Sequence, residues 1–238
     1  MLEIRKLRKS FGGVIAVKDV SLNVERGKIV CLIGPNGAGK TTLFKLITRE
    51  LEADSGEIYF KGIRVNDLSP YEVARLGIGR VFQIPLLWDD LSVLQNLCVP
   101  RVWRKESLTQ IKERAHEILT FLNLTHLKDE PARNLSGGQR RLLEIGRVMM
   151  LDPDLFLLDE PFVGLHPIIK KQILDCILSL NKMGKTFIVT SHDMSSVAYL
   201  CEKGCNDVVV MSAGEIIARG ELQEIRNNTK VIQAYLGE

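Results

Sequence analysis

Residues 28–41 read KIVCLIGPNGAGKT, and this stretch decides the fold. The part from Gly34 to Thr41 matches G-x-x-x-x-G-K-[ST], a loop whose backbone N–H groups converge on phosphate oxygens. The apolar run IVCLI before it has the length of a buried strand. The run KTTLFKLITRE after it spaces Leu43, Leu46 and Ile47 for one buried helix face. A strand, a loop and a helix in this order predict a site for nucleotide phosphates.

The residue types in this loop each have a physical reason. Glycines let the backbone approach phosphate oxygens, and a helix that begins near Gly39 directs the positive end of its dipole at the same anion. We expect Lys40 to reach the β- and γ-phosphates and the Thr41 hydroxyl to bind Mg²⁺. The residues expected to bind ATP in this loop are Gly34, Pro35, Asn36, Gly37, Ala38, Gly39, Lys40, Thr41 and Thr42.

Outward from the loop, the pattern alternates between strands and helices. Strands are expected at residues 2–8, 21–24, 28–33, 57–60, 78–83, 155–158, 186–190, 207–211 and 215–219, and helices at 108–122, 167–180 and 194–200. Such alternation predicts an α/β fold with a mostly parallel sheet and a ligand at the carboxyl ends of its strands. Residues 84–150 show helical patterns only. We therefore expect an α/β core of residues 1–83 and 151–238 with a helical lobe of residues 84–150 inserted.

Two carboxylates follow an apolar strand in the run LFLLDE, residues 155–160. We expect Asp159 to hold Mg²⁺, directly or through water, and Glu160 to polarise the attacking water as a general base. A strand that ends in two solvated acids is the alternative. The phosphate loop in the same chain argues against it.

The run LSGGQ, residues 135–139, has a structural and a functional interpretation that coexist. Ser136 and Gln139 fit a capping box that opens a helix. A cap does not explain Gly137 and Gly138 in the first helical turn, where glycine loses backbone entropy. Close approach of a phosphate to the start of the helix does explain them.

Composition excludes several classes of protein. The net charge is only +3, so we expect no nucleic-acid partner. The longest apolar runs are far short of the roughly 20 residues that span a bilayer, and no signal peptide is evident. The five cysteines include no C-x-x-C pair. Cys201 and Cys205 could share a helix face as a metal pair, but reduced thiols are favoured because a third and a fourth ligand are not evident.

Together, GPNGAGKTT, LSGGQ and LFLLDEP resemble the motifs of the ATP-binding cassette (ABC) transporter family, and the resemblance runs over essentially the whole chain. It implies a RecA-like P-loop NTPase core with a small antiparallel β part near the N-terminus. It also implies two cassettes packed head to tail. In that dimer each ATP lies between one phosphate loop and the other chain's signature residues, which here are Ser136, Gly137, Gly138 and Gln139.

The same resemblance assigns further residues by position. Gln83 matches the glutamine that senses Mg²⁺ and the attacking water, and His192 matches the histidine at the γ-phosphate. Phe11 matches the aromatic residue that stacks on adenine. His166 stands where most family members carry Asp, in the loop that links the two nucleotide sites. We expect this histidine to alter the coupling of the two sites.

The family implies a separate membrane permease, with this chain on the cytoplasmic, inner face of the membrane and a second ATPase subunit beside it. Residues 84–103 carry Leu86, Leu87, Trp88 and Trp103, which are candidate apolar anchors for a permease helix, with filling of the core of the lobe as the alternative. The runs GIGRVFQIPLLWDDLSVLQNL, EPFVGLHP and VIQAYLGE are similar to ATPases for branched-chain amino-acid import, which would add an indirect substrate-binding protein. Lipopolysaccharide-export ATPases are the close second interpretation, and DNA-repair or ribosome-associated cassettes are remote. Cargo, direction of transport and homo- or heterodimer stay open.

Overall fold

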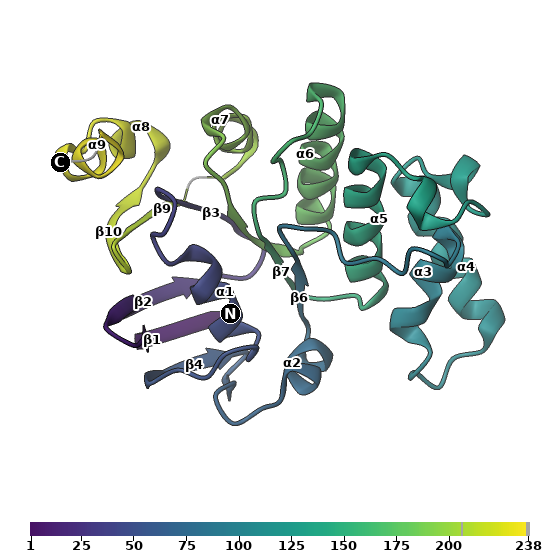
Figure 1. Cartoon of the computed structure of the whole chain (residues 1–238), viewed down its shortest axis with the longest axis horizontal. Helices are drawn as coiled ribbons and strands as arrows, with labels where there is room; N and C mark the ends of the chain where they lie inside the picture. The colour runs from purple at the N-terminus through teal and green to yellow at the C-terminus, as the bar shows by residue number, and fades with distance from the viewer. Residues whose placement is uncertain (206, 237–238) are drawn as a thin grey trace.

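The structure is a computed structural model that describes residues 1–205 and 207–236, and its strands form two sheets (Figure 1). The strands are β1 (Leu2–Phe11), β2 (Val14–Val24), β3 (Ile29–Ile33), β4 (Ser55–Phe60), β5 (Ile63–Arg64), β6 (Ile78–Val81), β7 (Leu155–Leu158), β8 (Thr186–Thr190), β9 (Asp207–Ser212) and β10 (Glu215–Gly220). The α-helices are α1 (Lys40–Ile47), α2 (Pro70–Leu76), α3 (Val93–Cys98), α4 (Leu108–Phe121), α5 (Gly137–Met150), α6 (Pro167–Lys182), α7 (Met194–Lys203), α8 (Leu222–Arg226) and α9 (Thr229–Leu236).

The larger sheet has the strand order β10-β9-β3-β8-β7-β6. Strand β3 is parallel to β8 and β9, and β7 is parallel to β6 and β8, whereas β10 is antiparallel to β9. Every residue of β3 is buried, because a core covers each face of the sheet. Cys31 belongs to one core and Leu32 to the other, as the alternation of side chains along a strand requires. The predicted mostly parallel α/β sheet is therefore confirmed.

The smaller sheet is antiparallel, with the order β2-β1-β4-β5, and contains the N-terminal strands, as predicted. It shares a core with α1, whose Leu43 and Phe44 are fully buried between the two sheets. Strand β2 begins at Val14, seven positions before the predicted start at residue 21, because it pairs with β1 back to Phe11 at the hairpin turn. A local pattern could not show this long-range pairing.

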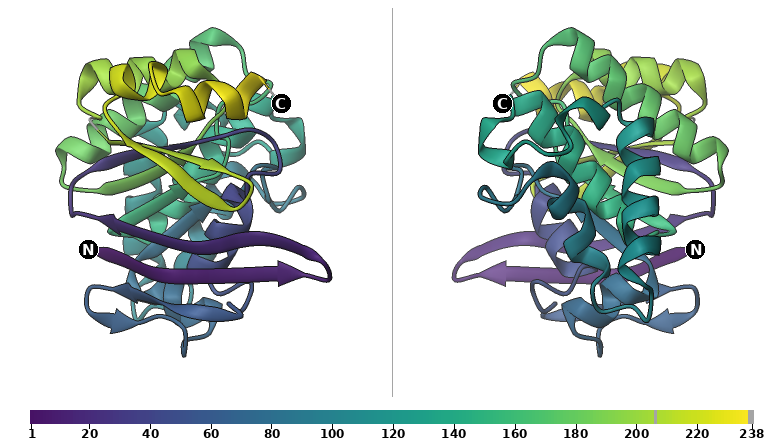
Figure 2. Two further views of the ribbon diagram at one scale, coloured as in Figure 1. Left: turned by 90° about the vertical axis from the view of Figure 1, so that its left-hand side faces the viewer. Right: turned by 90° about the vertical axis from the view of Figure 1, so that its right-hand side faces the viewer.

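Residues 84–150 are helical, with α3, α4, α5 and three short 3₁₀ turns (Val99–Arg101, Thr125–Leu127 and Ala132–Asn134), and they contain no strand. These helices gather at one end of the molecule, opposite the β1–β2 hairpin (Figures 1 and 2). The predicted helix at 108–122 is confirmed as α4. Within residues 1–205 and 207–236, no helix is both long and apolar enough to cross a bilayer.

The fold also differs from the sequence prediction in the end of one strand and in several elements that were not predicted. Strand β6 ends at Val81, so Gln83 does not close the strand but follows it by two residues. Helices α2, α3, α8 and α9 and the two-residue strand β5 were not predicted. All of these elements are short, and periodicity carries little information over so few residues.

Candidate nucleotide site

The phosphate loop connects β3 to α1 in a conformation that requires glycine. The backbone of Gly34 has φ 151° and that of Gly39, the residue that caps α1, has φ 99°. A Cβ at Gly34 would collide with the carbonyl oxygen of Met211, and one at Gly39 would collide with that of Ala16. The loop therefore lies tightly between β2 and β9, which explains these two glycines independently of a ligand.

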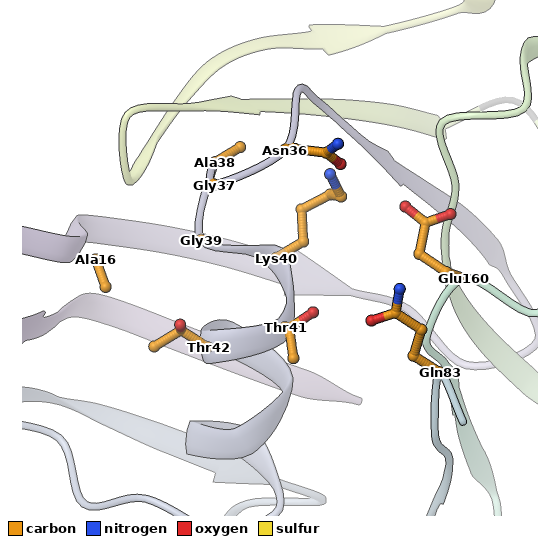
Figure 3. A pocket seen from close by; sticks show the side chains of 10 residues that line it. All are labelled: Ala16, Asn36, Gly37, Ala38, Gly39, Lys40, Thr41, Thr42, Gln83 and Glu160. Atoms are coloured by element: carbon orange, nitrogen blue, oxygen red, sulfur yellow. The ribbon is translucent and has the colours of Figure 1, made fainter. Parts of the chain in front are cut away.

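A cavity of about 270 Å³ opens beside the loop (Figure 3). Its lining residues are Ala16, Asn36, Gly37, Ala38, Gly39, Lys40, Thr41, Thr42, Gln83 and Glu160. Gln83 and Glu160 point into it from the wall opposite Lys40 and Thr41 (Figure 3). The fold thus gathers residues that are up to 144 positions apart, Ala16 and Glu160, around one space at the carboxyl ends of parallel strands.

The Lys40 ammonium group is held inside the loop. Its Nζ donates hydrogen bonds to the carbonyl oxygens of Gly34 at 2.6 Å and Pro35 at 3.1 Å. Burial lowers the pKa of Lys40, and the carboxylates of Glu160 and Asp159 act against that shift. A cation in a partly desolvated loop of N–H donors attracts phosphate oxygens strongly.

Asp159 is buried and accepts hydrogen bonds from three side chains. Its Oδ1 accepts hydrogen bonds from the Thr190 hydroxyl at 3.0 Å and the Thr41 hydroxyl at 3.3 Å, and its Oδ2 accepts one from Arg80 Nη2 at 2.9 Å. The Arg80 side chain is itself 5% exposed, so this is a buried ion pair. Arg80 therefore fixes the direction of the Asp159 carboxylate.

The donor set beside the loop fits Mg²⁺. The hydroxyl of Thr41 and the carboxylate of Asp159 touch, and the side-chain amide of Gln83 faces the same space (Figure 3). Hard oxygen ligands of this kind are those that Mg²⁺ prefers. When bound by Thr41, Asp159 and Gln83, Mg²⁺ would neutralise charge on the phosphate oxygens.

Glu160 and His192, far apart in sequence, are in direct contact. Glu160 Oε2 lies 2.9 Å from His192 Nδ1 and accepts a hydrogen bond from the His192 backbone N–H at 3.3 Å. The backbone of Glu160 has φ 47°, unusual for a residue with a side chain, and its N–H donates to the Thr190 hydroxyl at 2.8 Å. This geometry aims a nearly buried carboxylate, in contact with an imidazole, at the phosphate loop. Such a pair can orient and deprotonate a water molecule.

A buried ion pair on α5 holds the backbone that carries Gln83. Arg141 donates to the carbonyl oxygens of Phe82 and Gln83 and pairs with Glu144 at 2.7 Å. Glu144 Oε1 in turn accepts a hydrogen bond from the Phe82 N–H at 3.0 Å. Burial raises the pKa of Glu144 to about 7, and the Arg141 guanidinium opposes that rise. The helix that begins at the signature residues thus positions Gln83.

The signature residues and Phe11 lie outside this cavity. Ser136 caps α5, and the predicted capping box with Gln139 is present, with Ser136 N–H donating to Gln139 Oε1 at 2.8 Å. A Cβ at Gly137 would meet nothing within 4 Å, so packing inside this chain does not require glycine there. Phe11 is 46% exposed at the β1–β2 turn, with Lys9 Nζ 5.6 Å from its ring centre. Neither set of residues touches the phosphate loop in one chain.

Sequence reasoning missed several neighbours of the site. Arg80 and Thr190 could have been suspected, because polar side chains in buried parallel strands need partners. Arg141 and Glu144 gave no local signal. Tyr235 of α9 also reaches the loop: burial raises the pKa of its phenol, a hydrogen bond with the backbone of Gly34 opposes the rise, and Glu160 adds to it.

Comparison with known proteins finds families and relatives that agree with the motifs in the sequence. The family model described as "ABC transporter" matches residues 17–163, and the model described as "Branched-chain amino acid ATP-binding cassette transporter" matches residues 215–238. Among curated proteins, the chain is 39% identical to the "Probable branched-chain amino acid transport ATP-binding protein LivG" of Archaeoglobus fulgidus, covering 100% of this chain and 95% of the relative.

The chain is also similar to a second kind of relative and to a solved structure. The chain is 36% identical to the "Lipopolysaccharide export system ATP-binding protein LptB" of Haemophilus influenzae, covering 100% of this chain and 98% of the relative. A solved structure described as the dimeric structure of a bacterial ABC transporter cassette superposes with a TM-score of 0.84 at 28% identity. The match covers 93% of this chain and 99% of that one.

Proposed function

This chain belongs to the ABC transporter family as an ATP-binding, ATP-hydrolysing subunit, and on that premise we propose the roles of its site residues. Lys40, Thr41 and the loop backbone bind the phosphates, and Glu160 polarises the attacking water. His192 orients the Glu160 carboxylate and contacts the γ-phosphate, while Gln83 senses it from the opposite wall. The observation that carries these roles is the one cavity shared by the phosphate loop, Gln83 and Glu160.

The subunit pairs with a second ATPase subunit and with membrane permeases. We propose that residues 136–139 complete the partner's ATP site. Their support is threefold: they lie outside the chain's own cavity, Ser136 and Gly137 are exposed, and they begin the 14-residue helix α5, whose N–H groups and dipole favour an anion. Phe11, at the rim of the hairpin, then serves as the stacking surface for adenine.

Residues 84–150 are proposed as the signature subdomain that receives the permease, and residues 1–83 and 151–238 as the catalytic core. A groove of about 350 Å³ lies where the two meet, lined by Arg80, Phe82, Leu86, Trp88, Pro100, Glu144, Arg147, Val148 and Leu151. Leu86 is 57% exposed and Trp88 is 42% exposed, and Arg147 lies 3.9 Å from the centre of the Trp88 ring. Exposed apolar side chains along such a groove suit an amphipathic helix at the inner face of the membrane.

The cargo we propose is a branched-chain or other amino acid, moved inward with the help of a substrate-binding protein. The match of residues 215–238 to the branched-chain transporter model favours it, and this segment contains Tyr235, which reaches the phosphate loop. Lipopolysaccharide export is the second candidate, on the 36% identity to the export ATPase. Both candidates use the same nucleotide chemistry.

The nucleotide roles are tested with Glu160→Gln. We expect this variant to bind Mg-ATP normally, to hydrolyse it about 10²- to 10⁴-fold more slowly and to accumulate as a dimer in size-exclusion chromatography, because the γ-phosphate that joins the two halves stays in place. The exposed change Glu113→Gln is the control and should leave rate and dimer unchanged. A monomeric Glu160→Gln protein in saturating Mg-ATP would sink the proposal.

The cargo is tested on the complex purified from native membranes through a tag on this chain. Reconstituted in proteoliposomes, the complex should hydrolyse ATP faster when a loaded amino-acid-binding protein is added. Stimulation by lipopolysaccharide instead, with no response to amino acids, would move the function to export. Each outcome leaves the ATPase assignment unaffected.

A further inference from the structure

Three cysteines that are distant in sequence meet on the face of the six-stranded sheet that α7 covers (Figure 1). Cys31 is the middle residue of β3, Cys201 lies on α7, and Cys205 lies between α7 and β9. Their three sulfur atoms all lie within 4.8 Å of one another, and Cys31 Sγ and Cys205 Sγ are 3.5 Å apart. Cys31 is thus the third ligand atom that the sequence alone did not place beside the other two.

We propose that Cys31, Cys201 and Cys205 bind a thiophilic divalent ion of the Zn²⁺ class. A zinc–thiolate bond is about 2.3 Å long, so sulfurs that share one ion are about 3.8 Å apart. The 3.5 Å between Cys31 Sγ and Cys205 Sγ is slightly shorter than this distance, and the limit of 4.8 Å for the cluster is longer by about one ångström, so small movements of the side chains would match it. Three protein ligands leave a fourth position for water, an arrangement that Zn²⁺ accepts. Soft thiolate ligands also exclude Mg²⁺, which the nucleotide site prefers.

A pocket gives the ion a route to the sulfurs. It has a volume of about 260 Å³ and is lined by Ala198, Cys201, Glu202, Cys205, Glu221, Leu222, Gln223 and Arg226. Cys201 is only partly buried and is in the wall of this pocket, whereas Cys31 lies behind it, fully buried. A hydrated ion can therefore reach the two outer thiols first and the innermost thiol as it loses water.

The charge of the pocket wall suits a thiolate-bound ion. Three thiolates around a divalent ion carry one net negative charge, which Arg226 in the pocket wall offsets. Cysteine binds such an ion as the thiolate, so binding should release protons.

Packing and oxidation are the other possible roles of such a cluster. A buried cysteine often acts as a small apolar side chain, but three thiols in mutual contact leave polarisable groups that no aliphatic core needs. Cys31 and Cys205 are also close enough to form a disulfide after a small movement, with two protons and two electrons passing to an oxidant such as a peroxide. Metal binding and disulfide formation differ in the ion content of the protein and in the number of free thiols.

The test uses the reduced, metal-free full chain and Co²⁺ as the spectroscopic stand-in for Zn²⁺. One Co²⁺ per chain should produce a thiolate-to-cobalt charge-transfer band, Zn²⁺ should abolish the band, and the solution should gain protons as the ion binds. Cys201→Ser should weaken binding by at least about 10- to 100-fold, the loss that follows even from removing an outer-shell partner. Cys98→Ser changes a cysteine outside the cluster and should bind like the wild type.

A second readout covers the chance that a variant folds poorly. Zn²⁺ should raise the thermal unfolding midpoint of the wild type and of Cys98→Ser, but not that of Cys201→Ser, while all three bind Mg-ATP equally. The absence of a charge-transfer band in the wild type would overturn the proposal. Loss of two free thiols to peroxide with no Co²⁺ binding before oxidation would replace it with a disulfide.

Discussion

The phosphate loop and the signature segment, residues 135–139, are the two halves of the proposed nucleotide site, and they differ strongly in how the fold holds them. In the loop half, Lys40, Asp159 and Glu160 are each buried and hydrogen-bonded within the chain. In the signature half, Ser136 and Gln139 form the capping box and Gly138 packs against Ile169, but Gly137 faces open space. Buried polar groups need hydrogen-bond partners within the folded chain. Exposed backbone N–H groups at the start of a helix do not, because water can accept their hydrogen bonds until a ligand binds. With the proposed roles, one chain therefore contains a complete catalytic half and an incomplete binding half.

The first prediction tests whether the two halves belong to different chains of a dimer, by disabling each half in a separate variant. Lys40→Ala should slow hydrolysis about 10²- to 10³-fold because a phosphate-binding cation is lost. Gly137→Asp should have a similar effect because it places a negative charge where the partner's phosphate lies. It should fold normally, since the position is open and an acid suits a helix start. Gly137→Ala is the neutral control.

Mixing the two inactive variants then separates the alternatives. If the signature acts on the partner's ATP, about half of the dimers in an equal mixture combine one chain of each kind and hold one intact site. Up to about a quarter of the wild-type rate should return, as measured by phosphate release. A mixture that stays inactive would show that the signature acts within its own chain.

The second prediction concerns Arg141, which links the two halves. Arg141→Met keeps the length of the side chain but leaves Glu144 buried without its cation, so we expect a loss of about 3 to 5 kcal/mol in the free energy of unfolding. The rate of hydrolysis should also fall, with little change in the KM for ATP, because the backbone of Gln83 loses its support. Arg140→Met removes a neighbouring and more exposed pair with Asp89 and should cost under about 1 kcal/mol. Urea unfolding and steady-state kinetics measure both effects.

The sequence could predict those parts of the site that depend on residues close together in the chain. The phosphate loop, the capping box and the Asp159–Glu160 pair are local patterns, and each is present where the sequence placed it. Gln83 and His192 were placed only through the family resemblance, and the structure puts Gln83 in the wall of the cavity beside the loop and His192 against Glu160.

The supports of the site escaped prediction because their partners are distant. Arg80 meets Asp159 across 79 positions, and Arg141 meets Phe82 across 59. No periodicity encodes such pairs. The fold shows the same limit: β3 and α1 were read from their own residues, whereas the length of β2 depends on its pairing with β1.

The third prediction concerns how the stability contributed by Glu144, the partner of Arg141, depends on pH. The pKa of Glu144 rises from an ordinary value of 4.5 to about 7 in the folded protein, so the folded state binds this proton more tightly than the unfolded state does. The stability that protonated Glu144 contributes is fully present below pH 4.5 and is lost as the pH rises to about 7. The change is about 3 kcal/mol over that window. Glu144→Gln cannot titrate, so its unfolding free energy relative to wild type should grow by this amount between pH 4.5 and 7 and stay level above. Parallel curves for the two proteins in chemical denaturation would contradict the assignment.

The smallest expected effect lies in the loop between the two halves. His166 caps α6 through Nδ1, which accepts a hydrogen bond from the Ile168 N–H at 3.3 Å, where most family members carry Asp. Asp is a better cap and its charge suits the helix start, so His166→Asp should add about 0.5 to 1 kcal/mol to stability near neutral pH. His126→Asp makes the same change of side chain away from this cap and controls for net charge. If the cap also transmits between the two ATP sites, the Hill coefficient for ATP should rise in His166→Asp. An unchanged coefficient would confine His166 to a structural role in α6.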